Sequence, residues 1–356
     1  MTLGSTSEPL GSRYSDLLLD LDGVVYRGPS AVDHAVEALD DARTAGLSLT
    51  FVTNNAARTP TAVADHLNEL GITAVADEVV TSSHAVAAKL CSLVDDGKLD
   101  AHATVLVVGR EGLRTAVEDA GFRRVESAGD RPAVVVQGFG PDTSWRDLAE
   151  AAYAIGAGAT WIASNVDATL PTERGLAPGN GSLVAALALT TGQRPISVGK
   201  PDRQLFDTAL EGRQVDAEAA LVIGDRLDSD IEGAVNAGLD SLLVLTGVSG
   251  LAELFAAVPA RRPTFVGFDL RALREPQATV ASRVASRVAS TVSDRVEAGD
   301  TGRTCGGWTV CPDGGGWTVD GDGSPTALLR AATEAAWDRP DLDRGGLAEA
   351  VARLRA

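Results

Sequence analysis

Mostly apolar runs alternate with segments of helical spacing along much of this chain. The apolar runs predict buried strands, and they lie at 17–19, 47–52, 105–108, 133–136, 161–163, 220–223 and 242–245. Segments with apolar residues every three or four positions predict helices, and they lie at 30–45, 59–70, 83–94, 110–120, 144–156, 183–189 and 229–238. Strands and helices in alternation favour parallel sheets with right-handed crossovers. The expected fold class is therefore α/β, with a doubly wound, Rossmann-like parallel sheet.

The order of these elements predicts that one domain is inserted into another. Residues 99–190 carry their own alternation of strands and helices. After them comes the strand at 220–223, which, like the strand at 17–19, is followed directly by polar residues. We therefore expect a core domain at 15–98 and 191–275 and an inserted α/β domain at 99–190. Residues 1–14 are polar and lack a hydrophobic block, which predicts a flexible tail and no secretory signal.

The last part, 276–356, predicts a small α+β extension of different character. Valine recurs every four residues over 280–296, which is compatible with an amphipathic helix or a linker. The pentapeptide Gly-Gly-Trp-Thr-Val occurs at 306–310 and 315–319, which predicts a β-hairpin with tryptophans packed across its strands. Helices are expected at about 326–337 and 346–354.

Charge and cysteine content narrow the class of protein. The formal charge of −18 argues against nucleic acid or an anionic membrane as partner, because phosphates would be repelled. No uninterrupted apolar run is long enough for a transmembrane helix. Three widely spaced cysteines are too few for a disulfide framework, which fits the cytoplasm. The four histidines form no evident catalytic triad or zinc motif.

Two carboxylates stand directly after the first strand, in Asp20-Leu21-Asp22-Gly23. Because side chains alternate along an extended chain, Asp20 and Asp22 can point toward one reacting centre. Gly23 lets the chain turn away without blocking that centre. Two anions so close together require a cation or a shared proton. An ordinary Asp-Gly turn after a strand is the alternative interpretation.

Other strand ends carry the remaining polar groups of a phosphoryl-transfer site. Thr53-Asn54-Asn55 ends the second strand, and Asp225 with Asp230 follows the strand at 220–223. Lys200 stands shortly before that strand. Ligands of open parallel sheets bind at the carboxyl ends of strands, which predicts that these groups meet there. Carboxylates can hold a hard divalent ion, while the ion and the lysine neutralise a phosphate.

Four motifs in this order resemble those of haloacid dehalogenase superfamily phosphatases: Asp20-Leu21-Asp22-Gly23, Thr53, Lys200, and Gly224-Asp225 with Asp230. The form Phe51-Val52-Thr53-Asn54-Asn55 and the large insert between the second and third motifs are similar to the subgroup with a class IIA cap. The segments 171–175, 178–182 and 224–231 sharpen this resemblance, which covers about residues 15–270. With its extension, the chain is similar to actinobacterial members that act on glycerol 3-phosphate.

The resemblance implies a role for each motif residue. Asp20 would be the nucleophile that forms an aspartyl-phosphate, and Asp22 would protonate the leaving group and then activate water. Mg²⁺ is the implied cofactor, bound by Asp20, by Asp22 through its backbone carbonyl, and by Asp225. Phosphoryl oxygens would be held by Thr53, Asn54, Asn55 and Lys200.

Four further residues are expected near the site, each with a plainer alternative. Asp230 would orient Lys200 or a metal-bound water, or it is an acid favoured by the first turn of a helix. Asn165, Asp167 and Glu173, in the inserted cap, would contact the leaving group, or they form a hydrogen-bonded loop.

The function expected from this resemblance is Mg²⁺-dependent hydrolysis of a small phosphomonoester, with glycerol 3-phosphate as the implied substrate. Phosphoglycolate, pyridoxal phosphate, sugar phosphates and nucleotides are alternative substrates, and a phosphomutase is an alternative enzyme. A dehalogenase is disfavoured, because it needs no second carboxylate at position 22 to protonate an alkoxide. A phospholigand-binding regulatory protein is the non-enzymatic alternative. The resemblance also allows a homodimer formed through the cap.

Overall fold

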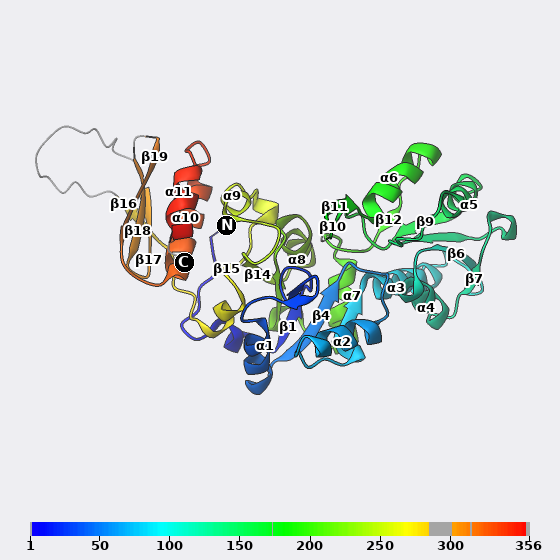
Figure 1. Cartoon of the computed structure of the whole chain (residues 1–356), viewed down its shortest axis with the longest axis horizontal. Coiled ribbons are helices and arrows are strands. Elements are labelled where there is room, and N and C mark those ends of the chain that lie inside the picture. Colours follow the sequence, from blue (N-terminus) through cyan, green and yellow to red (C-terminus); the bar gives the residue numbers. More distant parts are fainter. Residues whose placement is uncertain (1, 173, 285–300, 314, 354–356) are drawn as a thin grey trace, which may run out of the picture. The chain divides into compact units, whose positions relative to one another are not determined.

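The computed structural model describes residues 2–172, 174–284, 301–313 and 315–353 (Figure 1). The chain divides into two compact units. The first comprises Met1–Tyr26, Ala31–Ser48 and Glu218–Ala356, and the second comprises Arg27–Ser30 and Leu49–Ala217. No helix in the described ranges combines the length and apolar character needed to cross a bilayer.

The first unit contains four parallel strands in the order β15-β14-β13-β1. Their bounds are β1 Asp16–Leu19, β13 Ala220–Gly224, β14 Asp240–Val244 and β15 Phe265–Gly267. Every residue of these four strands is buried except Asp240 at the start of β14, as expected for strands covered on both faces. The register Leu19↔Ile223 brings the residues that follow β1 and β13 to the same end of the sheet. Helices of this unit are α1 Ala35–Thr44, α8 Glu232–Ala237, α9 Leu251–Phe255, α10 Pro325–Asp338 and α11 Gly345–Arg353.

The C-terminal extension forms an antiparallel sheet in the order β16-β17-β18-β19 against helices α10 and α11. The strands are β16 Ala281–Val284, β17 Thr301–Cys305, β18 Trp308–Asp313 and β19 Gly316–Gly321. The hairpin of β18 and β19 and both helices are confirmed. The predicted helix at 280–296 is wrong for its first part, because residues 281–284 form a strand that pairs with β17. Residues 285–300 lie outside the described residues. Trp308 lies opposite Gly321 and Trp317 opposite Pro312, so the tryptophans do not face each other.

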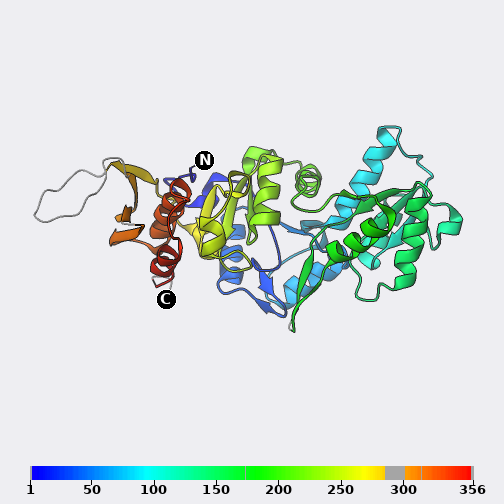
Figure 2. The same cartoon turned by 90° about the horizontal axis from the view of Figure 1, so that it is seen from above.

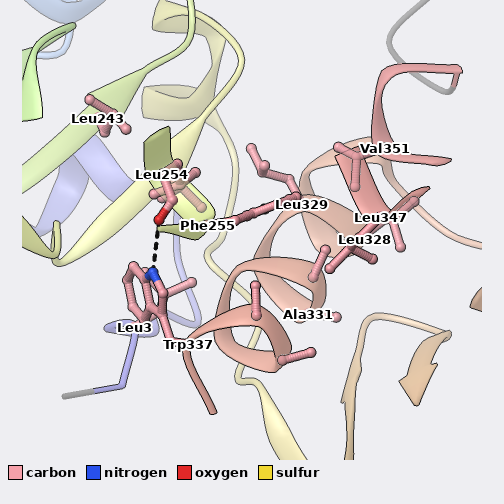
Figure 3. Close-up of a cluster of buried hydrophobic side chains, with 14 of the residues drawn as sticks. Leu3, Leu243, Leu254, Phe255, Leu328, Leu329, Ala331, Trp337, Leu347 and Val351 are labelled. Atoms are coloured by element: carbon pink, nitrogen blue, oxygen red, sulfur yellow. Dashed lines mark hydrogen bonds between the residues drawn. The ribbon is translucent and has the colours of Figure 1, made fainter. Parts of the chain in front are cut away.

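Helix α10 is buried along nearly its whole length, since it packs on β17 and β18 and also on α9 and β15 (Figures 1 and 2). Figure 3 shows Leu329 on the side of Leu254 and Phe255, and Leu328 on the side of α11. The Trp337 indole nitrogen donates to the Leu254 carbonyl at 2.8 Å. One apolar core thus joins the extension to strands of the first unit.

The N-terminal segment, expected to be a flexible tail, instead packs against this core. Leu3 and Leu10 are buried, and Gly4 donates its backbone N–H to the Thr264 carbonyl at 2.7 Å. The Leu3 N–H donates to the buried carboxylate of Glu334 at 2.8 Å. The buried guanidinium of Arg330 donates to the Gly4 carbonyl and to Gln277 Oε1. Two apolar side chains and these backbone hydrogen bonds anchor a segment whose average composition is polar.

Replacing Leu329 with alanine should lower the free energy of unfolding by about 2–5 kcal/mol, because it leaves a cavity among fully buried side chains. Urea-induced unfolding followed by tryptophan fluorescence measures the change. The matched control is Leu189→Ala, at a leucine that is 89% exposed, where we expect a change within about 0.5 kcal/mol. Equal losses in the two variants would show that α10 does not contribute to the core.

The second unit holds a five-stranded parallel sheet in the order β12-β9-β8-β6-β7. These strands are β6 Thr104–Val108, β7 Arg123–Val125, β8 Val134–Gln137, β9 Thr160–Ala163 and β12 Ile196–Ser197. Side chains alternate along β6, so Leu106 and Val108 pack with α5 and α6 while Val105 faces the other way. The remaining strand pairs of this unit are β4 Ser48–Thr53 with β5 Val79–Thr81, which are parallel, and β10 Thr169–Thr172 with β11 Gly175–Pro178, which are antiparallel.

The first four helices of the second unit begin within one residue of the predicted positions, the fifth begins three residues earlier than predicted, and the sixth was not predicted. They are α2 Pro60–Glu69, α3 Ser82–Asp95, α4 Glu111–Asp119, α5 Trp145–Gly156, α6 Asn180–Thr191 and α7 Gln204–Arg213. Thr59 caps α2 by accepting the Ala62 N–H at 3.3 Å, and Ser144 with Asp147 forms a capping box on α5. The helix predicted at 30–45 starts only at Ala35, as α1, because Ser30–Ala31 form the short strand β3. The other short strand, β2, is Tyr26–Arg27.

Candidate functional site

Three acids of the first unit come together where β1 and β13 end. Asp20 follows β1, and Asp225 and Asp230 follow β13. The Asp20 N–H donates to the Ile223 carbonyl at 2.9 Å, which extends the pairing of the two strands by one residue. Each acid offers a carboxylate oxygen that lies within 4.8 Å of those of the other two. Asp225 and Asp230 are fully buried, and Asp20 is half-buried.

The donor set of these acids fits a divalent cation. Like charges at this separation repel one another strongly in a partly buried environment, unless a cation lies between them. Carboxylate oxygens are the ligands that Mg²⁺ and Ca²⁺ prefer. Asp230, predicted to orient other groups, stands among the acids that could bind the ion directly.

The loop after β14 holds Asp225 in place. The Val248 N–H donates to Asp225 Oδ2 at 2.6 Å, and the Ser249 N–H donates to the Asp225 carbonyl at 3.0 Å. A Cβ at Gly247 would lie 1.8 Å from Asp225 Oδ2, so this position admits no side chain. Sequence reasoning missed Gly247 and Val248. The signal that could have found them is Thr246-Gly247 at the end of a predicted strand, the same pattern as at the other polar strand ends.

Two glycines next to the acids also lack room for a side chain. A Cβ at Gly23 would lie 2.6 Å from Asp225 Oδ2, and the φ of +93° at Gly23 is one that glycine adopts readily. A Cβ at Gly224 would lie 2.2 Å from the Asp230 Cβ. Asp230 Oδ2 accepts the Arg226 N–H at 3.0 Å, which fixes that carboxylate in the first turn after β13.

Asp22 differs from the other acids of its strand end. Its side chain is exposed, and it is not a member of the group of acids within the described residues. The Gly23 N–H donates to the Tyr26 carbonyl at 2.8 Å, which closes a turn directly after Asp22. An exposed carboxylate beside the three clustered acids is suited to exchange protons with solvent and substrate.

In the second unit, hydrogen bonds hold both the backbone and the side-chain ammonium of Lys200. Asn54 Oδ1 accepts the Lys200 N–H at 2.8 Å, and Asn54 Nδ2 donates to the Lys200 carbonyl at 3.0 Å. The Lys200 ammonium, which is buried, donates to the Val52 carbonyl at 3.2 Å. A Cβ at Gly199 would lie 2.4 Å from the Ser164 carbonyl oxygen, so the chain reaches Lys200 through a glycine. These contacts place the lysine at the end of β4.

The loop after β4 is fixed by its own polar groups. Thr53 Oγ1 accepts the Asn55 N–H at 3.1 Å, and Asn55 Oδ1 accepts the Ala57 N–H at 2.8 Å. Ser82 Oγ donates to the Asn54 carbonyl at 2.7 Å. The structure thus brings Thr53, Asn54, Asn55 and Lys200 together in one cluster, while their contact with phosphate stays a prediction.

Two of the three predicted cap residues join this cluster through hydrogen bonds. Asn165 Nδ2 donates to the Asn54 carbonyl at 2.7 Å, and Asp167 Oδ2 accepts from Asn54 Nδ2 at 3.1 Å. Asn165 Oδ1 also accepts the Asp167 N–H at 3.2 Å. These contacts favour the hydrogen-bonded loop over contact with a leaving group. Glu173 lies outside the described residues.

Comparison with known proteins finds two family models, which match the segments that carry the three clustered acids, Asp22, the loop after β4 and Lys200. One, described as haloacid dehalogenase-like hydrolase, matches residues 17–123. A second, described as HAD-hydrolase-like, matches residues 197–273.

Named relatives match over most of their own length. The chain is 45% identical over 329 residues to D-glycerol 3-phosphate phosphatase of Mycobacterium tuberculosis, covering 92% of this chain and 87% of the relative. It is 38% identical over 236 residues to the 5′-nucleotidase YutF of Bacillus subtilis, covering 66% and 89%. Among solved structures, it is similar to glycerol phosphate phosphatase from Mycobacterium tuberculosis in complex with magnesium, with a TM-score of 0.80, 41% identity and coverage of 97% and 98%.

Proposed function

Because the chain belongs to the haloacid dehalogenase-like hydrolases, we propose that it is a Mg²⁺-dependent phosphatase of small phosphomonoesters. The observation that carries this proposal is the group formed by Asp20, Asp225 and Asp230, whose oxygens lie within 4.8 Å of one another where β1 and β13 end. The relatives named above are themselves phosphatases or a nucleotidase, and one was solved with magnesium.

In the proposed reaction, each motif residue has the role that its family motif implies. Asp20 attacks phosphorus while the bond to the ester oxygen breaks, and Asp22 gives that oxygen a proton. Asp22 then takes a proton from water, which attacks the aspartyl-phosphate and restores Asp20. Thr53, the Asn54–Asn55 loop and Lys200 hold the phosphoryl oxygens. Asp20, the Asp22 carbonyl and Asp225 would hold Mg²⁺, with Asp230 beside them, and the ion would offset the negative charge of the phosphate.

The proposed domain roles follow the division inferred from the sequence. Residues 15–98 and 191–275 serve as the core that carries the reaction, and residues 99–190 serve as a cap that excludes water and selects the leaving group. Glycerol 3-phosphate is the proposed substrate, because the relative that acts on it matches 92% of this chain, including much of the extension. A homodimer and a cytoplasmic location remain predictions from the sequence.

Phosphate release should require Mg²⁺ and should be fastest, by kcat/KM, with glycerol 3-phosphate. The assay compares this ester with phosphoglycolate, pyridoxal phosphate, sugar phosphates and nucleotides, the last because of the nucleotidase relative. EDTA should remove the activity and added Mg²⁺ should restore it, because phosphate repels the acids when no cation is bound. Binding of several esters without turnover would instead support a regulatory protein, and a faster reaction with another ester would reassign the substrate.

A further inference from the structure

The segment Pro178-Gly179-Asn180-Gly181-Ser182, which contributes to the family resemblance, packs tightly on the loop that follows β9. The Gly181 N–H donates to the Asp167 carbonyl at 2.8 Å, and the Gly179 N–H donates to the Ala168 carbonyl at 3.0 Å. A Cβ at Gly179 would lie 2.4 Å from the Asp167 carbonyl oxygen, and one at Gly181 would lie 2.2 Å from that of Val166. The backbones of the turn and the loop are therefore in direct contact.

Between the two glycines, Asn180 starts a chain of hydrogen bonds that ends at Lys200. Asn180 is 2% exposed, and its Nδ2 donates to the Asn165 carbonyl at 2.7 Å. Asn165, 5% exposed, donates from its own Nδ2 to the Asn54 carbonyl at 2.7 Å. Asn54 in turn pairs through its side chain with both the N–H and the carbonyl of Lys200. Each link is a buried or partly buried amide contact of 2.7–3.0 Å.

We propose that Asn180 is a positioning residue for Lys200, acting through Asn165 and Asn54. This inference rests on the proposed function, since it assigns Lys200 to the phosphoryl group. Asn165 can hold the Asn54 carbonyl only while its own backbone keeps its place, and the Asn180 amide is a buried donor to that backbone. Without this donor, the Asn165 carbonyl loses a buried hydrogen bond and the loop relaxes. A small displacement of a group that holds substrate is enough to slow catalysis by about 10–100-fold.

The test is a double-mutant cycle with Asn180→Ala and Lys200→Ala, read as kcat/KM for glycerol 3-phosphate at saturating Mg²⁺. With Lys200 present, Asn180→Ala should lower kcat/KM by about 10-fold. In the Lys200→Ala background the same change should cost less than about 2-fold, because the group it positions is already gone. The matched control is Ser182→Ala, which removes a 2.7 Å hydrogen bond from the same turn to the Ala168 carbonyl. We expect the control to change kcat/KM by less than about 2-fold in both backgrounds.

Affinity for inorganic phosphate, measured by calorimetry, supplies a readout that needs no turnover. Asn180→Ala should weaken phosphate binding when Lys200 is present and should leave it unchanged when Lys200 is absent. If Asn180→Ala does not fold, as shown by circular dichroism, Asn180→Ser replaces it in the same cycle. Equal losses in both backgrounds overturn the inference and leave the proposed function standing. Failure of the unmodified enzyme to release phosphate from any ester overturns the proposed function itself.

Discussion

Replacing Asp20 with asparagine should abolish phosphate release, with kcat lowered by at least about 10³-fold. An amide is a far weaker nucleophile than a carboxylate, and it cannot form the acyl phosphate on which the proposed reaction depends. Because Asp225 and Asp230 are held by their own hydrogen bonds from the Val248 and Arg226 N–H groups, the variant should still fold. The measurement is steady-state phosphate release, together with acid-quench detection of the phosphorylated protein, which only the unmodified enzyme should give.

Asp40→Asn is the control for the loss of one negative charge, since Asp40 is exposed on α1 and distant in sequence from the acids at the strand ends. We expect full activity from it. Full activity in Asp20→Asn as well would exclude a covalent intermediate on this residue. Another acid would then have to be the nucleophile.

Replacing Gly247 with alanine should raise the Mg²⁺ concentration for half-maximal activity by at least about 10-fold. The new Cβ would lie 1.8 Å from Asp225 Oδ2 and 2.2 Å from its Cγ, so the carboxylate must leave its present position. Mutation of the groups that orient metal ligands typically lowers metal affinity by about 10–100-fold, and displacement of the ligand itself should cost at least as much. Titration of activity with Mg²⁺ measures the shift, and isothermal calorimetry with Mg²⁺ alone measures it without substrate.

Gly250→Ala, three residues further along the same loop, is the matched control. A Cβ there would meet only the mobile end of the Glu253 side chain, at 3.2 Å, so the Mg²⁺ requirement should be unchanged. An unchanged Mg²⁺ requirement in Gly247→Ala too would mean that Asp225 is not a ligand of the ion.

The α/β class and the boundaries of many elements could be predicted because their causes are local, although strands such as β5, β7 and β15 were not predicted. Thr59-Pro60 caps and starts α2, and Ser144 with Asp147 caps α5, through contacts within one helical turn. The polar strand ends were predictable for a related reason, since a buried apolar strand must deliver the next polar residue at its end. That rule identified Asp20 and Asp225 after β1 and β13, and Thr53 at the end of β4.

Other features could not be predicted, because they depend on partners far away in the chain. Valines spaced four apart favour a helix, yet Ala281–Val284 form a strand because β17 offers backbone partners. A polar N-terminal segment is typical of a flexible tail, yet Leu3 and Gly4 are bound by α10, more than 300 residues later. Asn165 and Asp167 were predicted to contact a leaving group only because they follow a strand. In the structure their side chains form hydrogen bonds with Asn54 instead.

The order of residues alone determined the layered fold and which side chains of the motifs stand at strand ends, since burial of apolar runs and helix capping act between near neighbours. Only the tertiary structure decided how those side chains are held. Val248 holds Asp225, and Asn165 and Asn54 link Asn180 to Lys200, through hydrogen bonds between side chains and backbone groups of separate loops. Such contacts arise when packing brings distant segments within hydrogen-bonding distance, and no periodicity in the sequence encodes them.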